Sequence, residues 1–239
     1  MEEIKLLQQL IDNSDNIVFF GGAGVSVESG IPDFRSENGI YNQKYDYPAE
    51  EILSHSFFYT HTDYFYNFCR EKIIMPNALP NDAHKKLAAL ENAGKVKAVI
   101  TQNIDGLHQA AGSKNVLELH GSMERNICLK CGKVYDASYV YKSEGIPKCT
   151  CGAVVKPEVV LYGESLDSYV ISKSLEYIAA ADVLIIGGTS LSVYPAAGMV
   201  DAYRGNKLVL INKTPTNRDN IANYIFYGSI GKIFSQIEV

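Results

Sequence analysis

Short apolar runs that alternate with helical stretches constrain the fold of this chain more than any other feature of its sequence. Such alternation predicts an α/β fold, with a mainly parallel sheet that carries helices on both faces. The expected strands are residues 17–20, 96–101, 116–119, 182–186 and 207–211.

Helix signals between these strands support the same fold class. Asn81 and Asp82 can cap a helix that carries Leu87 and Leu90, and Gly94 stands where a C-terminal glycine is expected. A further helix is expected over residues 166–180.

Two stretches interrupt the alternation, and we interpret them as insertions into the core. One is the segment 36–75, which is rich in Tyr and Phe, and the other is the cysteine-containing segment 122–155. Residues 1–35, 76–121 and 156–239 are therefore expected to form a large domain. The two insertions are expected to form a smaller one, with a helical module and a cysteine module.

Charge and hydropathy limit the partners of the chain. Its 239 residues carry a net charge of −5 and contain no Lys/Arg block, which argues against general nucleic-acid binding. The first residues are charged and amphipathic, with Ile4, Leu7 and Ile11 at helical spacing, unlike a signal peptide. No run approaches the roughly 18 apolar residues of a membrane span. We expect a soluble, cytoplasmic protein with no membrane partner.

Four of the five cysteines form two close pairs, Cys128 with Cys131 and Cys149 with Cys151. Four thiolates are a typical tetrahedral set for structural zinc, and a closed site of this kind leaves no open catalytic position. The second pair is shorter, with one intervening residue instead of two. A metal-free cluster of reduced thiols is the alternative. Cys69 lies apart and is expected to be a small core residue.

A glycine-rich segment, residues 21–30, follows the first expected strand directly. Glycines there let backbone amides approach a diphosphate, and the N-terminus of a following helix would add favourable partial charge. Val27 occupies the third glycine position of the usual dinucleotide fingerprint. A plain tight turn is therefore the alternative interpretation.

Polar residues also follow other expected strands. Gln102, Asn103 and Asp105 come after 96–101, where open parallel sheets bind ligands, and they suit ribose hydroxyls and a carboxamide. Helix capping would explain the same residues. His120 follows 116–119, and an ordinary histidine pKa of about 6.5 suits proton removal at neutral pH. We expect structural roles for the other histidines, His55, His61, His84 and His108.

Six ordered blocks resemble the sirtuin family of NAD-consuming protein deacylases, over about residues 15–234. They are Gly-Ala-Gly-Val-Ser with Ser-Gly-Ile-Pro-Asp-Phe-Arg in residues 22–35, then 101–108, 118–121, 156–164, 188–191 and Asn212. The resemblance implies a Rossmann-like core with a smaller helical and zinc-binding domain. It implies NAD and zinc as cofactors, and acetyl-lysine proteins or peptides as substrates.

The resemblance also assigns roles to residues. His120 would act as the general base, and Asn103 would position water. An extended substrate peptide would add a strand between two edges that include Val160, Tyr162, Gly163, Glu164 and Val193. The cofactor-binding set would be Gly22, Ala23, Gly24, Val27, Phe34, Arg35, Gln102, Asn103, Ile104, Asp105, Gly188, Thr189, Ser190, Asn212 and Ile230. The zinc ligands would be Cys128, Cys131, Cys149 and Cys151.

The implied reaction moves the acyl group from lysine to ADP-ribose and releases nicotinamide. A mono-ADP-ribosyltransferase and a non-enzymatic NAD-sensing or zinc-ribbon module are alternatives, and a dehydrogenase is a weaker one. Family members that remove acidic acyl groups carry a Tyr-x-x-Arg pair, whereas Cys69 follows Tyr66 at that spacing here. Arg70, one residue later, is rotated about 100° on a helix. We therefore expect a preference for acetyl over succinyl or malonyl groups.

Overall fold

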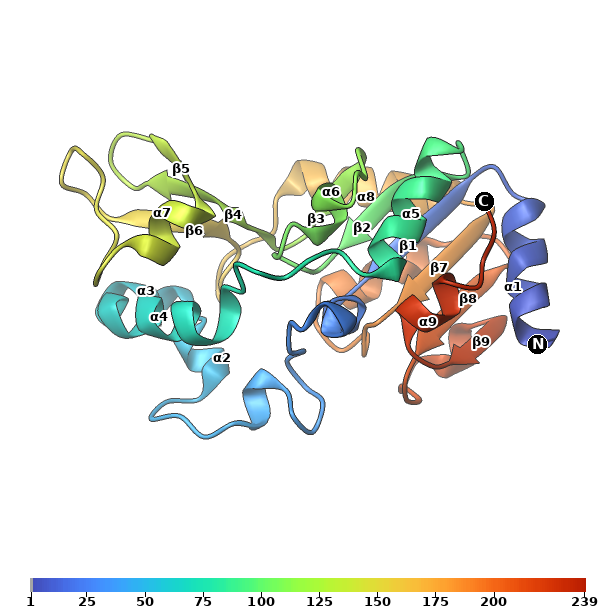
Figure 1. Ribbon diagram of the computed structural model, residues 1–239, viewed down its shortest axis with the longest axis horizontal. Coiled ribbons are helices and arrows are strands. Elements are labelled where there is room, and N and C mark those ends of the chain that lie inside the picture. The colour runs from blue at the N-terminus through green and yellow to red at the C-terminus, as the bar shows by residue number, and fades with distance from the viewer. Residues whose placement is uncertain (1) are drawn as a thin grey trace.

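The computed structural model describes residues 2–239 and contains two sheets, one large and one small (Figure 1). The large sheet has six strands in the order β3-β2-β1-β7-β8-β9, and all neighbours are parallel. Its strands are β1 (Ile17–Gly21), β2 (Val96–Thr101), β3 (Val116–Glu118), β7 (Val183–Gly187), β8 (Leu208–Asn212) and β9 (Tyr224–Tyr227). The predicted α/β class is confirmed. Sequence reasoning missed β9.

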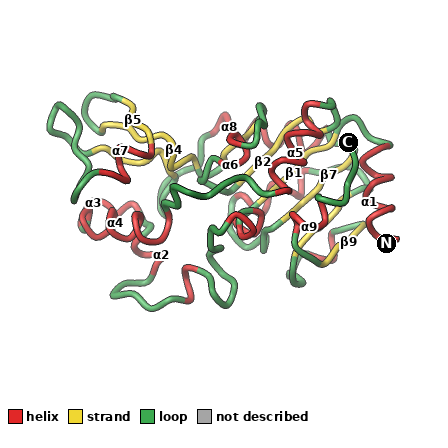
Figure 2. The backbone as a smooth tube through the Cα atoms, viewed as in Figure 1, coloured by secondary structure: helices red, strands yellow, loops and turns green. Residues whose placement is uncertain are grey.

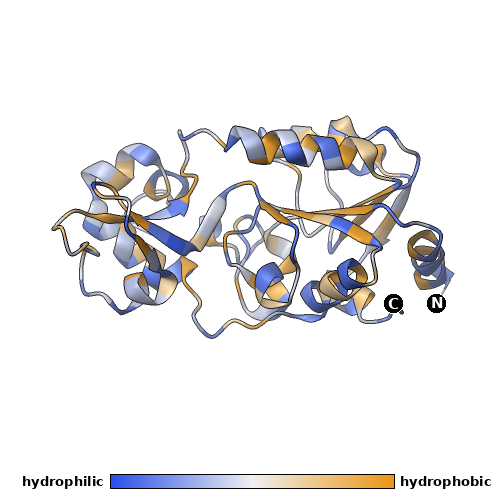
Figure 3. Cartoon of the chain, turned by 90° about the horizontal axis from the view of Figure 1, so that it is seen from above, coloured by the Kyte–Doolittle hydropathy of each residue, from blue (hydrophilic) through white to orange (hydrophobic). Residues whose placement is uncertain are grey.

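Alternate residues of the central strands pack into two separate cores. Ile17 and Phe19 of β1 face one cluster, while Val18 and Phe20 face the other. Because side chains alternate across a strand, a sheet that is buried on both faces has continuous apolar strands. Figure 3 shows these strands largely in orange, between helices that also carry hydrophilic residues.

Helices cover both faces of the large sheet. One core receives residues from α1 (Glu2–Asp12), α5 (Asp82–Asn92) and α9 (Ile230–Phe234). The other receives residues from α8 (Ser168–Ala180) and the 3₁₀ segment Ala196–Ala202. The predicted cap of α5 is confirmed, since the Asn81 side chain accepts a hydrogen bond from the Ala83 amide at 2.9 Å. No helix within residues 2–239 has the length and apolarity that crossing a membrane would require.

The segment after β1 corrects one expectation. Two single-turn 3₁₀ helices, Ala23–Val25 and Val27–Ser29, follow the strand, so no long helix N-terminus adds its partial charge there. The Gly22 and Gly24 amides instead donate to the Gly187 and Gly188 carbonyls. These bonds tie the segment to the end of β7 and to the residue that follows it.

The smaller part of the molecule combines helices with an antiparallel sheet (Figure 2). Its sheet has the order β5-β4-β6, from β4 (Gly121–Cys128), β5 (Val134–Asp136) and β6 (Val155–Val159), and α7 (Ala137–Lys142) lies beside it. The helical module contains α2 (Ala49–Ile52), α3 (His55–Thr60) and α4 (Thr62–Phe68). The short helix α6 (Leu107–Ala110) belongs to the large part of the molecule. Cys69 is buried in the core of this smaller part, as predicted. The residue-level domain boundaries stay a prediction.

Candidate functional site

A cavity of about 1020 Å³ opens beside the carboxyl ends of the large sheet's strands. The strands β1 and β7 are neighbours at the point where the chain order of the sheet reverses, and such switch points are where open α/β sheets bind ligands. Every residue predicted to bind cofactor or substrate lines this cavity, and so does His120. The fold thus gathers side chains from all the predicted blocks outside the cysteine segment.

At the floor of the cavity, the loops that follow β1 and β7 are in close backbone contact. A Cβ atom at Gly24 would lie 2.8 Å from the Gly188 Cα, and one at Gly22 would lie 2.7 Å from the Thr189 Cβ. Gly188 also has a φ of +60°, in the left-handed region that favours glycine. These glycines are therefore needed for the two loops to pack, whatever their contact with a ligand.

A buried polar network connects the glycine-rich loop to the segment after β2. The Ser26 hydroxyl donates to Asp105 Oδ2 at 2.6 Å and accepts from Asn103 Nδ2 at 3.1 Å. Burial raises the pKa of the Asp105 carboxyl, although the hydrogen bond from Ser26 opposes this shift. Asp105 Oδ1 accepts from the Leu107 amide at the start of α6, although the N-cap residue of that helix is Gly106.

His120 lies between β3 and β4, and its ring orientation is set by the backbone. Its Nδ1 is 2.9 Å from the Gln102 carbonyl oxygen, which can only accept a hydrogen bond. Nδ1 therefore carries the proton, and in the neutral ring Nε2 has the free lone pair. Burial lowers the pKa of His120, while the bond to Gln102 opposes the shift. Burial thus favours the neutral form of the imidazole beside the cavity.

The opposite end of the cavity is organised by Asn212 at the end of β8. Its side-chain amide accepts from the Thr189 amide at 3.1 Å and donates to the Thr189 carbonyl at 3.0 Å. Gln102 Nε2 donates to the Thr189 hydroxyl, also at 3.0 Å. Thr189 is therefore the point where the loops after β2, β7 and β8 meet.

Residues on the rim connect the helical module to the segment after β6. The Glu164 carboxylate accepts from the Leu161 amide and pairs with Lys156 and His55, so it stabilises its own turn. The Val160 amide donates to the His120 carbonyl at 2.9 Å. These bonds place the predicted substrate segment directly beside the histidine.

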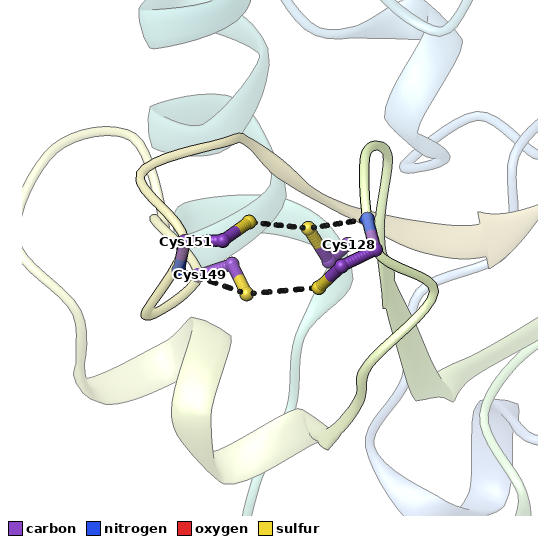
Figure 4. Close-up of side chains that lie close together, drawn as sticks. Cys128, Cys149 and Cys151 are labelled. Atoms are coloured by element: carbon purple, nitrogen blue, oxygen red, sulfur yellow. Dashed lines mark hydrogen bonds between the residues drawn. The ribbon is translucent and has the colours of Figure 1, made fainter.

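The four predicted metal-ligating cysteines converge in the small part of the molecule (Figure 4). Their sulfur atoms all lie within 4.8 Å of one another, with Cys128–Cys151 and Cys131–Cys149 pairs at 3.5 Å. A tetrahedral zinc with 2.3 Å bonds to sulfur requires separations of about 3.8 Å. The cluster therefore fits zinc, and it lies outside the lining of the large cavity.

The stretch that would bind an acidic acyl group is directed away from the cavity. The Tyr66 hydroxyl donates to the Val155 carbonyl, and Cys69 is buried beside it. Arg70 donates to the Val140 and Gly145 carbonyls and to the Ser143 hydroxyl. Its guanidinium is therefore engaged with the segment around the end of α7.

Sequence reasoning missed two residues of the cavity wall. Ser26 joins Asn103 to Asp105, and its only sequence signal is its place in the glycine-rich segment. Tyr41 lies against Phe34, with ring centroids 5.3 Å apart, and the Arg35 guanidinium lies 5.0 Å from the Tyr41 ring centroid. Neither contact can be located from spacing along the chain.

The parallel sheet, the switch-point cavity and the added cysteine module define a nucleotide-binding α/β protein with a metal-binding module. Comparison with known proteins gives the family. The Sir2 family model matches residues 22–195. The NAD-dependent protein deacetylases of Clostridium acetobutylicum and Clostridium perfringens are each 56% identical to this chain, over 99% of it and 98% of their own lengths. The chain therefore belongs to the Sir2 family, which confirms the sirtuin resemblance.

Solved structures agree with this assignment. A Sir2 variant with deacetylated p53 peptide and 3′-O-acetyl ADP-ribose matches with a TM-score of 0.89 and 38% identity, over 98% of this chain and 96% of that one. A Sir2 mutant with p53 peptide and NAD matches with a TM-score of 0.86 and 37% identity, over the same shares.

Proposed function

We propose that this protein is an NAD-dependent protein lysine deacetylase, in which NAD and an acetyl-lysine side chain meet in the large cavity. NAD would supply the ribose that accepts the acyl group, with release of nicotinamide. The proposal is supported by full-length relatives with this activity and by a cavity that all the implied residues line.

The main support for the proposal is the orientation of the His120 ring by the Gln102 carbonyl. Because the Gln102 carbonyl fixes the proton on Nδ1, the lone pair of Nε2 is free to take a proton from a ribose hydroxyl. A binding module that only senses NAD has no need for a neutral, oriented base. His120 would be the general base.

The remaining residues would hold the two substrates. Asp105 and the Ile104 backbone would hold the carboxamide, and Asn103, fixed by Ser26, would position water. Thr189, Ser190, Asn212 and Ile230 would serve the adenosine half. The rim residues Val160, Tyr162, Gly163, Glu164 and Val193 would receive the peptide as an added strand.

The four cysteines would hold one structural zinc, which contributes to folding and takes no part in the chemistry. The substrates would be acetylated proteins or peptides. We also propose a cytoplasmic location and no general nucleic-acid or membrane binding, in keeping with the net charge of −5.

The test is to incubate the protein with NAD and acetyl-, succinyl- and longer-acyl-lysine peptides, and to measure nicotinamide and product masses. Deacetylation gives free lysine and O-acetyl-ADP-ribose. A peptide or protein that gains the mass of ADP-ribose would instead identify a mono-ADP-ribosyltransferase. NAD binding without nicotinamide release would identify a sensing module.

A further inference from the structure

The two cysteine pairs receive different backbone support. In the longer pair, the Lys130 and Cys131 amides both donate to Cys128 Sγ, at 3.4 and 3.5 Å. In the shorter pair, only the Cys151 amide donates to Cys149 Sγ, at 3.5 Å. The next amide, that of Gly152, donates to the Cys149 carbonyl oxygen at 2.8 Å and not to sulfur. The shorter pair therefore has one backbone donor to sulfur, where the longer pair has two.

A side chain on β5 supplies a second donor to the Cys149 sulfur. The Tyr135 hydroxyl donates to Cys149 Sγ at 3.1 Å and accepts from the Thr150 amide at 3.3 Å. With this contact, the Cys149 sulfur accepts from the Cys151 amide and the Tyr135 hydroxyl, and the Thr150 hydroxyl lies farther away, at 3.9 Å. The Tyr135 hydroxyl also bridges the thiolate and the backbone of the residue between the two cysteines.

Local packing holds Tyr135 in this position. It lies on β5, opposite Asn126 of β4, and it packs against the cluster that contains Cys128 and Cys149. Its ring lies 4.3 Å, centroid to centroid, from that of Tyr139. The hydroxyl therefore reaches sulfur from a ring fixed on two sides.

We propose that the Tyr135 hydroxyl replaces the backbone donor that the shortened Cys149–Cys151 pair lacks, and so holds the Cys149 thiolate in position for zinc. Hydrogen bonds to zinc-bound thiolates offset the negative charge of the site, and such outer partners typically change metal affinity by about 10- to 100-fold. Tyr135 is thus a positioning residue. The inference rests on zinc binding and is independent of the deacetylation reaction.

The test compares Tyr135→Phe with Tyr139→Phe. The first loses only the hydroxyl at sulfur, whereas the second loses a hydroxyl of the same module that donates to the Lys148 carbonyl. Zinc content is measured by mass spectrometry of the reduced proteins, and zinc transfer is followed with the chelator pyridylazoresorcinol. We expect Tyr135→Phe to weaken zinc binding by about tenfold or more, and Tyr139→Phe to match the original protein.

Substitution of zinc by cobalt(II) separates positioning of the thiolate from general loss of stability. Removing a donor from sulfur should move the thiolate-to-cobalt charge-transfer band to lower energy in Tyr135→Phe alone. Unchanged zinc affinity in Tyr135→Phe, an equal loss in Tyr139→Phe, or identical cobalt spectra would each overturn the proposal. Original protein purified without zinc would overturn it too, whereas absence of nicotinamide release would count only against the proposed function.

Discussion

The hydroxyl oxygens of Tyr41 and Tyr162 lie 2.7 Å apart and join the segment after the glycine-rich loop to the segment after β6. Tyr41 also contacts Phe34 and Arg35, which are proposed to bind the cofactor. Tyr162 belongs to the proposed substrate segment. One hydrogen bond therefore links the two proposed binding segments across the rim of the cavity.

Tyr162→Phe should raise the KM for NAD by about 2- to 12-fold with little change in kcat, the equivalent of one net hydrogen bond of about 0.5–1.5 kcal/mol. Steady-state kinetics at saturating peptide measure this change. Tyr41→Phe is the matched control, since it removes the same bond from the other side. The double variant should show no further loss. An unchanged KM in both single variants would exclude this role for the pair.

His120→Ala should keep the fold and NAD binding but lose deacetylation by about 10²- to 10⁴-fold, the usual contribution of a general base. Nicotinamide release and O-acetyl-ADP-ribose are measured together, and circular dichroism checks the fold. His55 contacts Glu164 but does not itself line the cavity, so His55→Ala is a control for loss of an imidazole outside the cavity lining. Turnover near the original rate in His120→Ala would remove His120 from this role.

The pH dependence of kcat/KM follows from the burial of His120. Burial lowers its pKa, so the neutral ring persists below the ordinary histidine value of about 6.5. Activity should therefore stay constant as the pH falls to about 6.5 and decline only below it. A pH profile with one acetylated peptide tests this, and a decline that begins above pH 7 would contradict it.

Two other buried histidines should make the fold sensitive to acid. Burial lowers the pKa of His84 to about 4 and that of His108 to about 3, so both are neutral in the folded chain at pH 6. The unfolded chain binds protons at these residues below about pH 6.5. Stability should therefore be lost as the pH falls from about 6.5 to 4, by about 1.4 kcal/mol per pH unit for each histidine.

Urea unfolding at several pH values measures this slope. His108→Gln should reduce the slope by the contribution of one proton, because glutamine does not titrate. A slope that is equal in His108→Gln and the original protein would contradict the assignment.

Acetyl-lysine should be preferred over succinyl-lysine by more than about tenfold in kcat/KM, since tenfold requires only about 1.4 kcal/mol. An acyl carboxylate that enters the cavity would find no arginine at the Tyr-x-x-Arg position, because Cys69 is buried there and Arg70 donates to Val140, Ser143 and Gly145. The two acylated forms of one peptide provide the comparison. A faster succinyl reaction would mean that another cation reaches the acyl group.

Much of the fold was predictable because its strands are continuously apolar. The buried strands β1, β2, β7 and β8 differ from the expected ranges by at most one residue at either end. In β9, by contrast, only Phe226 is buried and Tyr227 is exposed, and sequence reasoning missed the strand although its Tyr-Ile-Phe-Tyr run consists of residues that favour strands.

The site was predictable as a set of residues but not as a network. Residues that follow parallel strands must gather at one edge of the sheet, and family blocks identified most of them. The hydrogen bond from Ser26 to Asp105 joins positions 79 residues apart, so no spacing along the chain indicates it. Tyr135 was missed for the same reason, since its partner Cys149 is on another segment.

The contact between Gly24 and Gly188 also sets which parts of the site can be redesigned. Backbone atoms meet there with no room for a methyl group, so any larger residue would displace both loops together. Ser190, whose side chain is exposed, carries no such restriction. A library of variants for altered nucleotide analogues should therefore keep these two glycines and vary Ser190. The two glycines lie in the loops that directly follow β1 and β7, so the position of these strands sets the shape of the cavity floor.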